Sequence, residues 1–72
     1  EAPLEVRVNG QPLAVIMRTP GGERALALGF LLSEGLLRSG ADLAGVELSD
    51  AADVVNVRFI RGRRPRLQPN IA

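Results

Sequence analysis

The strongest structural signal in this chain of 72 residues is the stretch Leu4-Glu5-Val6-Arg7-Val8-Asn9-Gly10. Apolar and charged residues alternate from position 4 to position 8, which is typical of a strand with one buried face. The Asn-Gly pair that follows accepts positive φ at both central positions of a tight turn. The apolar run 13–18 then comes after Pro12, and proline is tolerated at the start of a strand. The sequence therefore predicts a β-hairpin. Apart from Arg18, its second strand is apolar on both faces, so something should cover each face.

A helix is expected after the hairpin. Residues 19–22, Thr-Pro-Gly-Gly, break the second strand, and the helix begins either with Thr19 as N-cap or near Gly22 and Glu23. From position 25 to position 37 the pattern is helical and apolar on most of its circumference. We therefore expect a helix that is buried on most of its sides, which a hairpin alone cannot provide.

Two glycines of this segment carry separate expectations. Gly35 is the natural C-terminal cap, which leaves the apolar residues 36 and 37 to fold back onto the core. Gly29 lies in the middle of the helix, where glycine costs about 1 kcal/mol relative to alanine. Its presence is interpreted as a close approach of the helix to a strand.

The remaining elements complete an α+β pattern. Residues 46–48 form a possible short strand, and 54–60 read as a third main strand with Val55, Val57 and Phe59 on one face. The prediction is a small mixed or antiparallel sheet, built from the hairpin and a later strand, with one main helix packed on it. Residues 1–60 are expected to be the N-terminal domain of a larger protein. Residues 61–72 are expected to be an arginine-rich linker or tail towards a missing C-terminal domain.

The composition and charge of this chain limit the classes of function that it can have. A chain of this size is marginally stable, and it has neither cysteine for disulfides nor histidine for metals, so a partner surface, including a homodimer, is expected. The first residue is Glu1 and not methionine, which fits a piece of a longer polypeptide. The net charge of +1 is too small to indicate nucleic-acid binding by itself, and no apolar run is long enough for a membrane span. A cytoplasmic protein is the default expectation.

The best candidate site is the junction between the second strand and the helix, with Arg18, Thr19 and Gly21. Glycines expose backbone N–H groups, a helix start is partly positive, and Arg18 adds a forked cation, so the junction suits an anion such as a phosphate of a nucleotide or a pterin cofactor. The alternative is that the glycines only make the turn and Arg18 pairs with a carboxylate. No catalytic or metal-ligating residue is predicted, because the chain has no Cys, His, Lys or Tyr.

Three ordered blocks of this sequence resemble the N-terminal region of the formate dehydrogenase accessory protein family (FdhD). The blocks are residues 1–10, residues 12–15 with 17–21, and Glu23 with 26–35. The resemblance is clear from position 1 to about position 38 and looser to position 60.

The resemblance implies a sulfurtransferase that takes sulfur from a cysteine desulfurase. It implies delivery of that sulfur to the molybdenum bis-guanine dinucleotide cofactor of formate dehydrogenase, carried by a Cys-x-x-Cys motif. Because the thiolate is the sulfur carrier, this cysteine-free chain cannot perform the transfer itself. It is expected to be scaffold and part of the wall of a cofactor or guanine-nucleotide site, through Arg18, Thr19 and Gly21.

Two other interpretations stay open from the sequence. The chain could be a non-catalytic module that dimerises or binds partners through its apolar helix. It could also be a small nucleic-acid binder, since five of its nine arginines fall between positions 58 and 66, although no aromatic residue lies among the arginines from position 61 to 66 to stack on bases.

Overall fold

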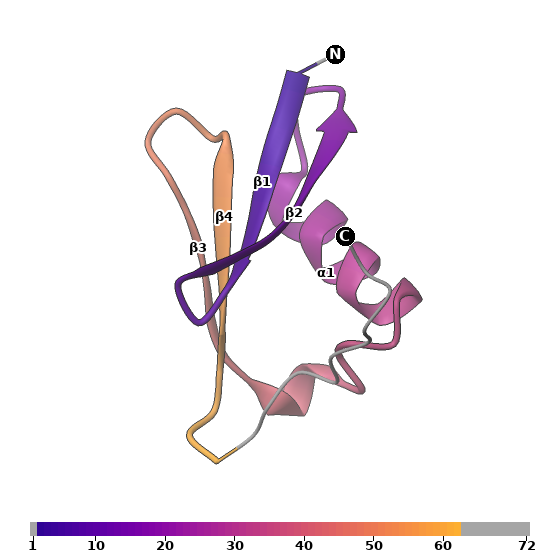
Figure 1. Cartoon of the computed structure of the whole chain (residues 1–72), viewed down its shortest axis with the longest axis vertical. Helices are drawn as coiled ribbons and strands as arrows, with labels where there is room; N and C mark the ends of the chain where they lie inside the picture. Colours follow the sequence, from indigo (N-terminus) through magenta and orange to yellow (C-terminus); the bar gives the residue numbers. More distant parts are fainter. Residues whose placement is uncertain (1, 63–72) are drawn as a thin grey trace.

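The computed structural model describes residues 2–62 and shows a four-stranded sheet with one helix packed against it (Figure 1). The predicted α+β class is therefore confirmed. Most of the predicted arginine-rich tail, from residue 63 onwards, lies outside the described residues. The elements in chain order are β1 (Ala2–Val8), β2 (Gln11–Arg18), α1 (Glu23–Ser33), the short 3-10 helix η1 (Gly40–Asp42), β3 (Leu43–Leu48) and β4 (Val54–Phe59).

The sheet is mixed, with the strand order β2-β1-β4-β3. Two antiparallel hairpins, β1 with β2 and β3 with β4, are joined by parallel pairing of β1 with β4. Parallel strands need a long crossover connection, and here α1 and η1 supply part of it (Figure 1). The first strand of the chain therefore lies in the middle of the sheet.

The turn of the first hairpin has the backbone that Asn-Gly predicts. Asn9 has φ 50° and Gly10 has φ 81°, so both central residues are left-handed. Asparagine tolerates this conformation. The Asn9 side chain also contacts β4, because its Oδ1 accepts a hydrogen bond from the Phe59 backbone N–H at 2.9 Å. The turn is thereby attached to the end of β4.

The core lies between α1 and one face of the sheet. Alternate residues of the strands face the helix, as expected for a half-buried sheet. The predicted inward face of the last strand is confirmed, since Val55, Val57 and Phe59 are all buried. The buried apolar set is Leu4, Val6, Val8, Ala27, Leu31, Leu36, Leu37, Val55, Val57 and Phe59.

Helix α1 begins at Glu23, the later of the two predicted starts, and Thr19 is not its N-cap. Gly22 occupies the N-cap position with φ 67° and offers no side chain to cap the helix. At the other end the helix stops at Ser33, and Gly35 turns left-handed with φ 74°, in agreement with its predicted place at the C-terminal cap. The N–H groups of Gly35 and Leu36 donate to the carbonyls of Leu32 and Leu31, which is a Schellman motif.

As predicted, the two residues after this cap return to the core, with Leu36 2% and Leu37 4% exposed. The residues of this chain alone do not bury the helix on most of its sides, and its cover by a partner stays a prediction. Leu26 and Leu32 are 39% and 50% exposed, because the sheet covers a single side of α1. The interpretation of Gly29 is wrong: Gly29 is exposed, and a Cβ built there meets nothing within 4 Å.

Strand β3 is longer than the predicted segment 46–48. Its first half contains Gly45, and the register with β4 shifts between Leu43 and Gly45. This irregularity interrupts the alternation by which a strand is recognised in a sequence. The Arg58 side chain lies over Gly45, where an added Cβ would come within 2.5 Å of the guanidinium.

Candidate functional site

The predicted site lies in the loop that joins the end of β2 to the start of α1. Arg18 is the last residue of β2 and is buried, with 6% of its surface exposed. Thr19 and Gly21 are exposed on the loop that follows. Gly21 has φ 114°, a backbone conformation that side chains other than glycine rarely adopt. The structure therefore brings the three predicted residues to one corner, with one of them covered and two accessible.

Arg18 is held by partners within the chain. One terminal guanidinium nitrogen, Nη2, donates a hydrogen bond of 2.6 Å to the carbonyl oxygen of Ala52. Its Nε lies 3.6 Å from Glu23 Oε2, and both side chains of this ion pair are nearly covered, at 5% and 9% exposed. This bears out the alternative that Arg18 pairs with a carboxylate. Nε itself has no hydrogen-bond partner.

Glu23 connects the loop, the helix and Arg18. Its carboxylate accepts a hydrogen bond of 2.8 Å from the Gly21 backbone N–H. This bond, the Glu23 N–H and the charge of Arg18 together hold the pKa of the Glu23 carboxyl below its ordinary value of 4.5, although burial opposes the shift. Glu23 is also in the first turn of α1, where the helix dipole favours a negative charge.

These contacts define what the corner can do chemically. The carboxylate of Glu23 takes the Gly21 N–H and offsets the charge of Arg18, two features that an incoming anion would use. In the folded chain, the positive charge of this corner is therefore neutralised by the chain's own carboxylate. Thr19 is exposed to solvent. The solvent side of Gly21 is also free, because a Cβ built there would meet nothing within 4 Å.

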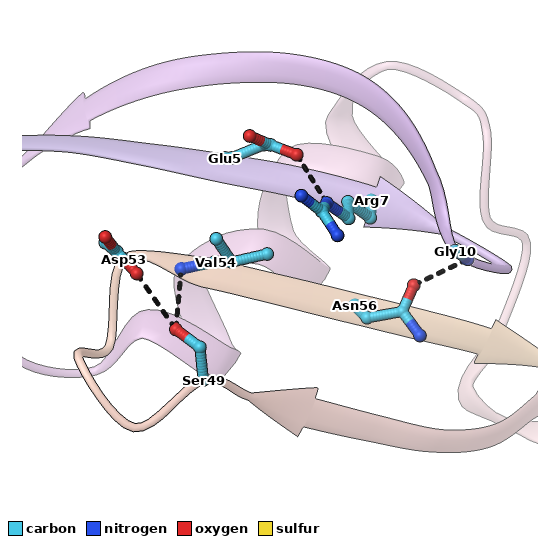
Figure 2. A network of polar contacts seen from close by, with 7 residues as sticks. All are labelled: Glu5, Arg7, Gly10, Ser49, Asp53, Val54 and Asn56. Carbon is cyan, nitrogen blue, oxygen red and sulfur yellow. Dashed lines mark hydrogen bonds and ion pairs between the residues drawn. The ribbon is translucent and has the colours of Figure 1, made fainter.

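A second polar cluster, on the sheet face opposite α1, was missed by sequence reasoning (Figure 2). Asn56 on β4 accepts a hydrogen bond of 2.8 Å from the Gly10 N–H and donates one of 3.1 Å to Glu47. Figure 2 also shows the pairing of Arg7 with Glu5 on β1. These groups alternate with core residues along their strands, so a sequence shows them only as the solvent-facing half of each pattern.

Part of this cluster borders a shallow depression of about 260 Å³. The polar groups that line it already form hydrogen bonds or ion pairs within the chain. Arg58 donates a hydrogen bond of 2.6 Å to Glu47, and the Asn56 amide and Arg58 together hold the pKa of Glu47 below its ordinary value. At the far end, Ser49 Oγ accepts from the Val54 N–H and donates to Asp53 (Figure 2). The residues that line the depression are Arg7, Gly10, Glu47, Leu48, Ser49, Val54 and Asn56.

Within residues 2–62, no group of three or more His, Cys, Asp or Glu side chains is placed to hold a metal ion. The helices of this part of the chain are also too short or too polar to cross a membrane.

The described residues thus define a small α+β scaffold whose charged corner is occupied by its own side chains. The chain belongs to the FdhD/NarQ family, whose model matches residues 1–70. It is 49% identical over 72 residues to the "Sulfur carrier protein FdhD" of Streptomyces coelicolor, a match that covers 89% of this chain and 26% of that protein.

Other relatives carry the same name. The "Sulfur carrier protein FdhD" of Streptomyces avermitilis is 49% identical over 70 residues, covering 86% of this chain and 25% of that protein. The protein of that name from Anaeromyxobacter dehalogenans is 52% identical over 46 residues, covering 64% of this chain and 16% of that protein. The chain thus spans about a quarter of the length of the first two relatives. No solved structure matches it significantly.

Proposed function

We propose that this chain is the scaffolding part of a sulfur carrier protein that serves formate dehydrogenase. In this proposal the whole protein is a cytoplasmic homodimer that receives sulfur from a cysteine desulfurase and passes it to the molybdenum bis-guanine dinucleotide cofactor. Membership of the FdhD/NarQ family and the name that the relatives carry, sulfur carrier protein, support the proposal.

One observation indicates which part of sulfur delivery this chain can perform. Sulfur is carried by a thiolate, and none of the 72 residues is a cysteine. The sulfur-bearing residue must therefore belong to another part of the protein, outside the quarter that this chain matches. What the chain supplies is a stable frame and one corner that faces the cofactor.

The corner of Arg18, Thr19 and Gly21 is our candidate for contact with the cofactor or with a guanine nucleotide. Because Glu23 already neutralises Arg18, the corner would contact the ligand through the Thr19 hydroxyl and the exposed backbone of Gly21. Arg18 would act by fixing the loop, through its hydrogen bond to the Ala52 carbonyl and its ion pair with Glu23. The cofactor would supply the sulfur acceptor, and these residues would orient it.

The exposed apolar side chains favour a second candidate function, a non-catalytic interaction module. Among the described residues, five large apolar side chains are 39% to 64% exposed, and exposed apolar side chains that lie together mark interaction surfaces. These residues are Val15, Met17, Leu26, Leu32 and Ile60.

Complementation separates the two functions. A chimera in which this chain replaces the matched region of the Streptomyces coelicolor protein should restore formate oxidation to cells that lack their sulfur carrier protein. This chain alone should not. Restoration by the chain alone, or failure of a well-folded chimera, would contradict the proposal.

The cofactor-facing corner is tested by Thr19→Ala in the same chimera. Loss of one hydrogen bond should weaken the binding of GDP, measured by calorimetry, by roughly fivefold. Ser33→Ala is the matched control, because Ser33 is an exposed hydroxyl at the other end of α1. Equal affinities of the two variants would remove Thr19 from the site.

A further inference from the structure

The outer face of the sheet, opposite α1, has one half that is polar and one half that is apolar. On the side of β3 and β4, the charged side chains are paired with one another, as in the contacts of Glu47 with Asn56 and Arg58. These groups are exposed and mutually satisfied, so this half is stable in contact with water.

The half of this face on β2 is apolar. Val15 and Met17 alternate with the inward-facing Ile16, and they are 64% and 61% exposed. Pro3 pairs in register with Met17 and is exposed beside it. We call Pro3, Val15 and Met17 the β2 strip. Uncovered apolar side chains of this size on a neighbouring pair of strands indicate a surface that something else covers.

The edge of the sheet next to the strip is also open. β2 is the terminal strand in the order β2-β1-β4-β3, so its outer backbone groups have no partner strand among the described residues. Positions 11–17 contain no charged residue, and charges are a common protection of edge strands. Only the end near the turn is protected, by Pro12 and a register shift opposite Val6 and Arg7.

The opposite edge of the sheet is protected in a way that β2 is not. β3 carries Glu47, which is ion-paired to Arg58 across the strands, and its register shifts between Leu43 and Gly45. A charge and an irregularity on an edge both discourage the addition of another strand. The two edges therefore differ in the exposed charge that β3 carries, and the part of the β2 edge beyond Pro12 and its register shift is next to the β2 strip.

We propose that the β2 strip and the outer edge of β2 dock an uncharged, apolar segment from the remaining part of a longer sulfur carrier polypeptide. The segment continues the sheet beyond β2 and covers Val15 and Met17. This inference depends on the proposed function in one respect, that the chain works as part of such a polypeptide.

The distribution of exposed apolar residues favours this partner over a second copy of the chain. Leu26 and Leu32 are exposed on α1, on the other side of the sheet from the β2 strip. One symmetric contact between two copies covers one side of each. The relatives are about four times as long as this chain, and a body of that remaining length is large enough to reach both sides.

Charge insertion tests the proposal in two contexts. In the isolated chain, Val15→Arg should leave the melting temperature almost unchanged, because Val15 is exposed there. In the Streptomyces coelicolor chimera, the same change should lower the melting temperature by about 4 °C or more, since it places a charge in a buried contact. Gln11→Arg is the matched control, since it adds the same charge to β2 at an exposed position outside the strip.

A second measurement covers the case in which the arginine variant fails to fold. Val15→Cys in the isolated chain, which has no other thiol, should react rapidly with a maleimide. The peptide that carries this residue in the folded chimera should react at least tenfold more slowly, as quantified by mass spectrometry.

The stability and labelling measurements decide the docking proposal without measuring sulfur transfer. Equal effects of Val15→Arg and Gln11→Arg in the chimera, or equal labelling of Val15→Cys in both contexts, would overturn it. A dimer of the isolated wild-type chain that Val15→Arg dissociates in sedimentation would also overturn it, in favour of a second copy. Loss of sulfur delivery with an intact β2 contact would contradict the proposed function and leave the docking proposal standing.

Discussion

Glu23 shows how a single side chain can decide whether a charged corner is available. Its carboxylate is hydrogen-bonded to the Gly21 N–H and lies 3.6 Å from Arg18 Nε. A helix start with an adjacent arginine suits an external anion, and here the chain supplies the anion itself. The first effect of Glu23 is therefore on stability.

This stability should depend on pH. The pKa of Glu23 is lower in the folded chain than its ordinary value of 4.5, so folding favours the ionised form. Its contribution is fully present above pH 4.5 and is lost as the pH falls through the folded pKa. We expect wild type to exceed Glu23→Gln in urea midpoint at pH 7, and the gap to shrink steadily below pH 4.5.

Urea unfolding at several pH values between 7 and 3 measures this gap. Glu47 also has a lowered pKa and is present in both proteins, so its titration cancels in the difference. A gap that stays constant down to pH 3 would show that the carboxylate charge of Glu23 contributes nothing to folding.

At the scale of the element, α1 contains an unfavourable residue, Gly29, whose role was predicted wrongly from the sequence. Gly29 lies in the middle of the helix and is exposed, with open space where a Cβ would be. Glycine therefore costs the helix conformational entropy without a packing benefit in this chain. Gly29→Ala should raise the free energy of unfolding by about 1 kcal/mol.

For a domain of this size, that gain corresponds to roughly 4–8 °C in melting temperature, which calorimetry resolves. Gly22→Ala is the control, because Gly22 caps the same helix with φ 67° and alanine there is strained. Gly22→Ala should destabilise the chain. If Gly29→Ala destabilises it as well, then something covers that side of the helix.

The first hairpin depends on Asn9 for more than its turn. Asn9→Ala puts alanine at φ 50° and leaves the N–H of the buried residue Phe59 without its acceptor. We expect a loss of about 1–3 kcal/mol in the free energy of unfolding, from denaturant titration. Asn9→Asp keeps the acceptor and the tolerance of this backbone, so it should retain most of the stability. Equal losses would show that the Phe59 contact is unimportant.

The elements show which features a sequence can reveal. The alternation in residues 4–8, the Asn-Gly turn and the inward triplet Val55, Val57 and Phe59 were predicted because each follows from neighbouring residues. The parallel pairing of β1 with β4 was not predicted, since its partners are about 50 positions apart and no local pattern encodes them. The same limit applies to Ala52, whose carbonyl accepts from Arg18 across 34 positions.

The candidate site was predicted in part. Its position at the end of β2 and the pairing of Arg18 with a carboxylate were foreseen, the latter as the alternative to a ligand. That the carboxylate belongs to Glu23 follows only from the way the loop turns at Gly21 and Gly22. Contact of Arg18, Thr19 and Gly21 with a cofactor stays a prediction.

At the scale of the whole molecule, residues 2–62 form a small core with ten buried apolar residues. Domains of this size bury only about 60% of their unfolded surface and rarely exceed about 3–5 kcal/mol in stability. We expect the isolated chain to unfold in urea with a free energy no greater than about 5 kcal/mol. The chimera, in which the exposed apolar residues find cover, should be more stable. An isolated chain as stable as the chimera would contradict this.

The central place of β1 also governs how the chain can form during synthesis. β1 pairs with β2 on one side and with β4 on the other, yet β4 is translated about 46 residues after β1 ends. At about 5–20 residues per second, a ribosome needs roughly 2–10 s to complete that stretch. Throughout that interval the first hairpin of the nascent chain has unpaired backbone groups along β1, on the side where β4 will later lie. A chaperone that shields growing chains would find its natural target there.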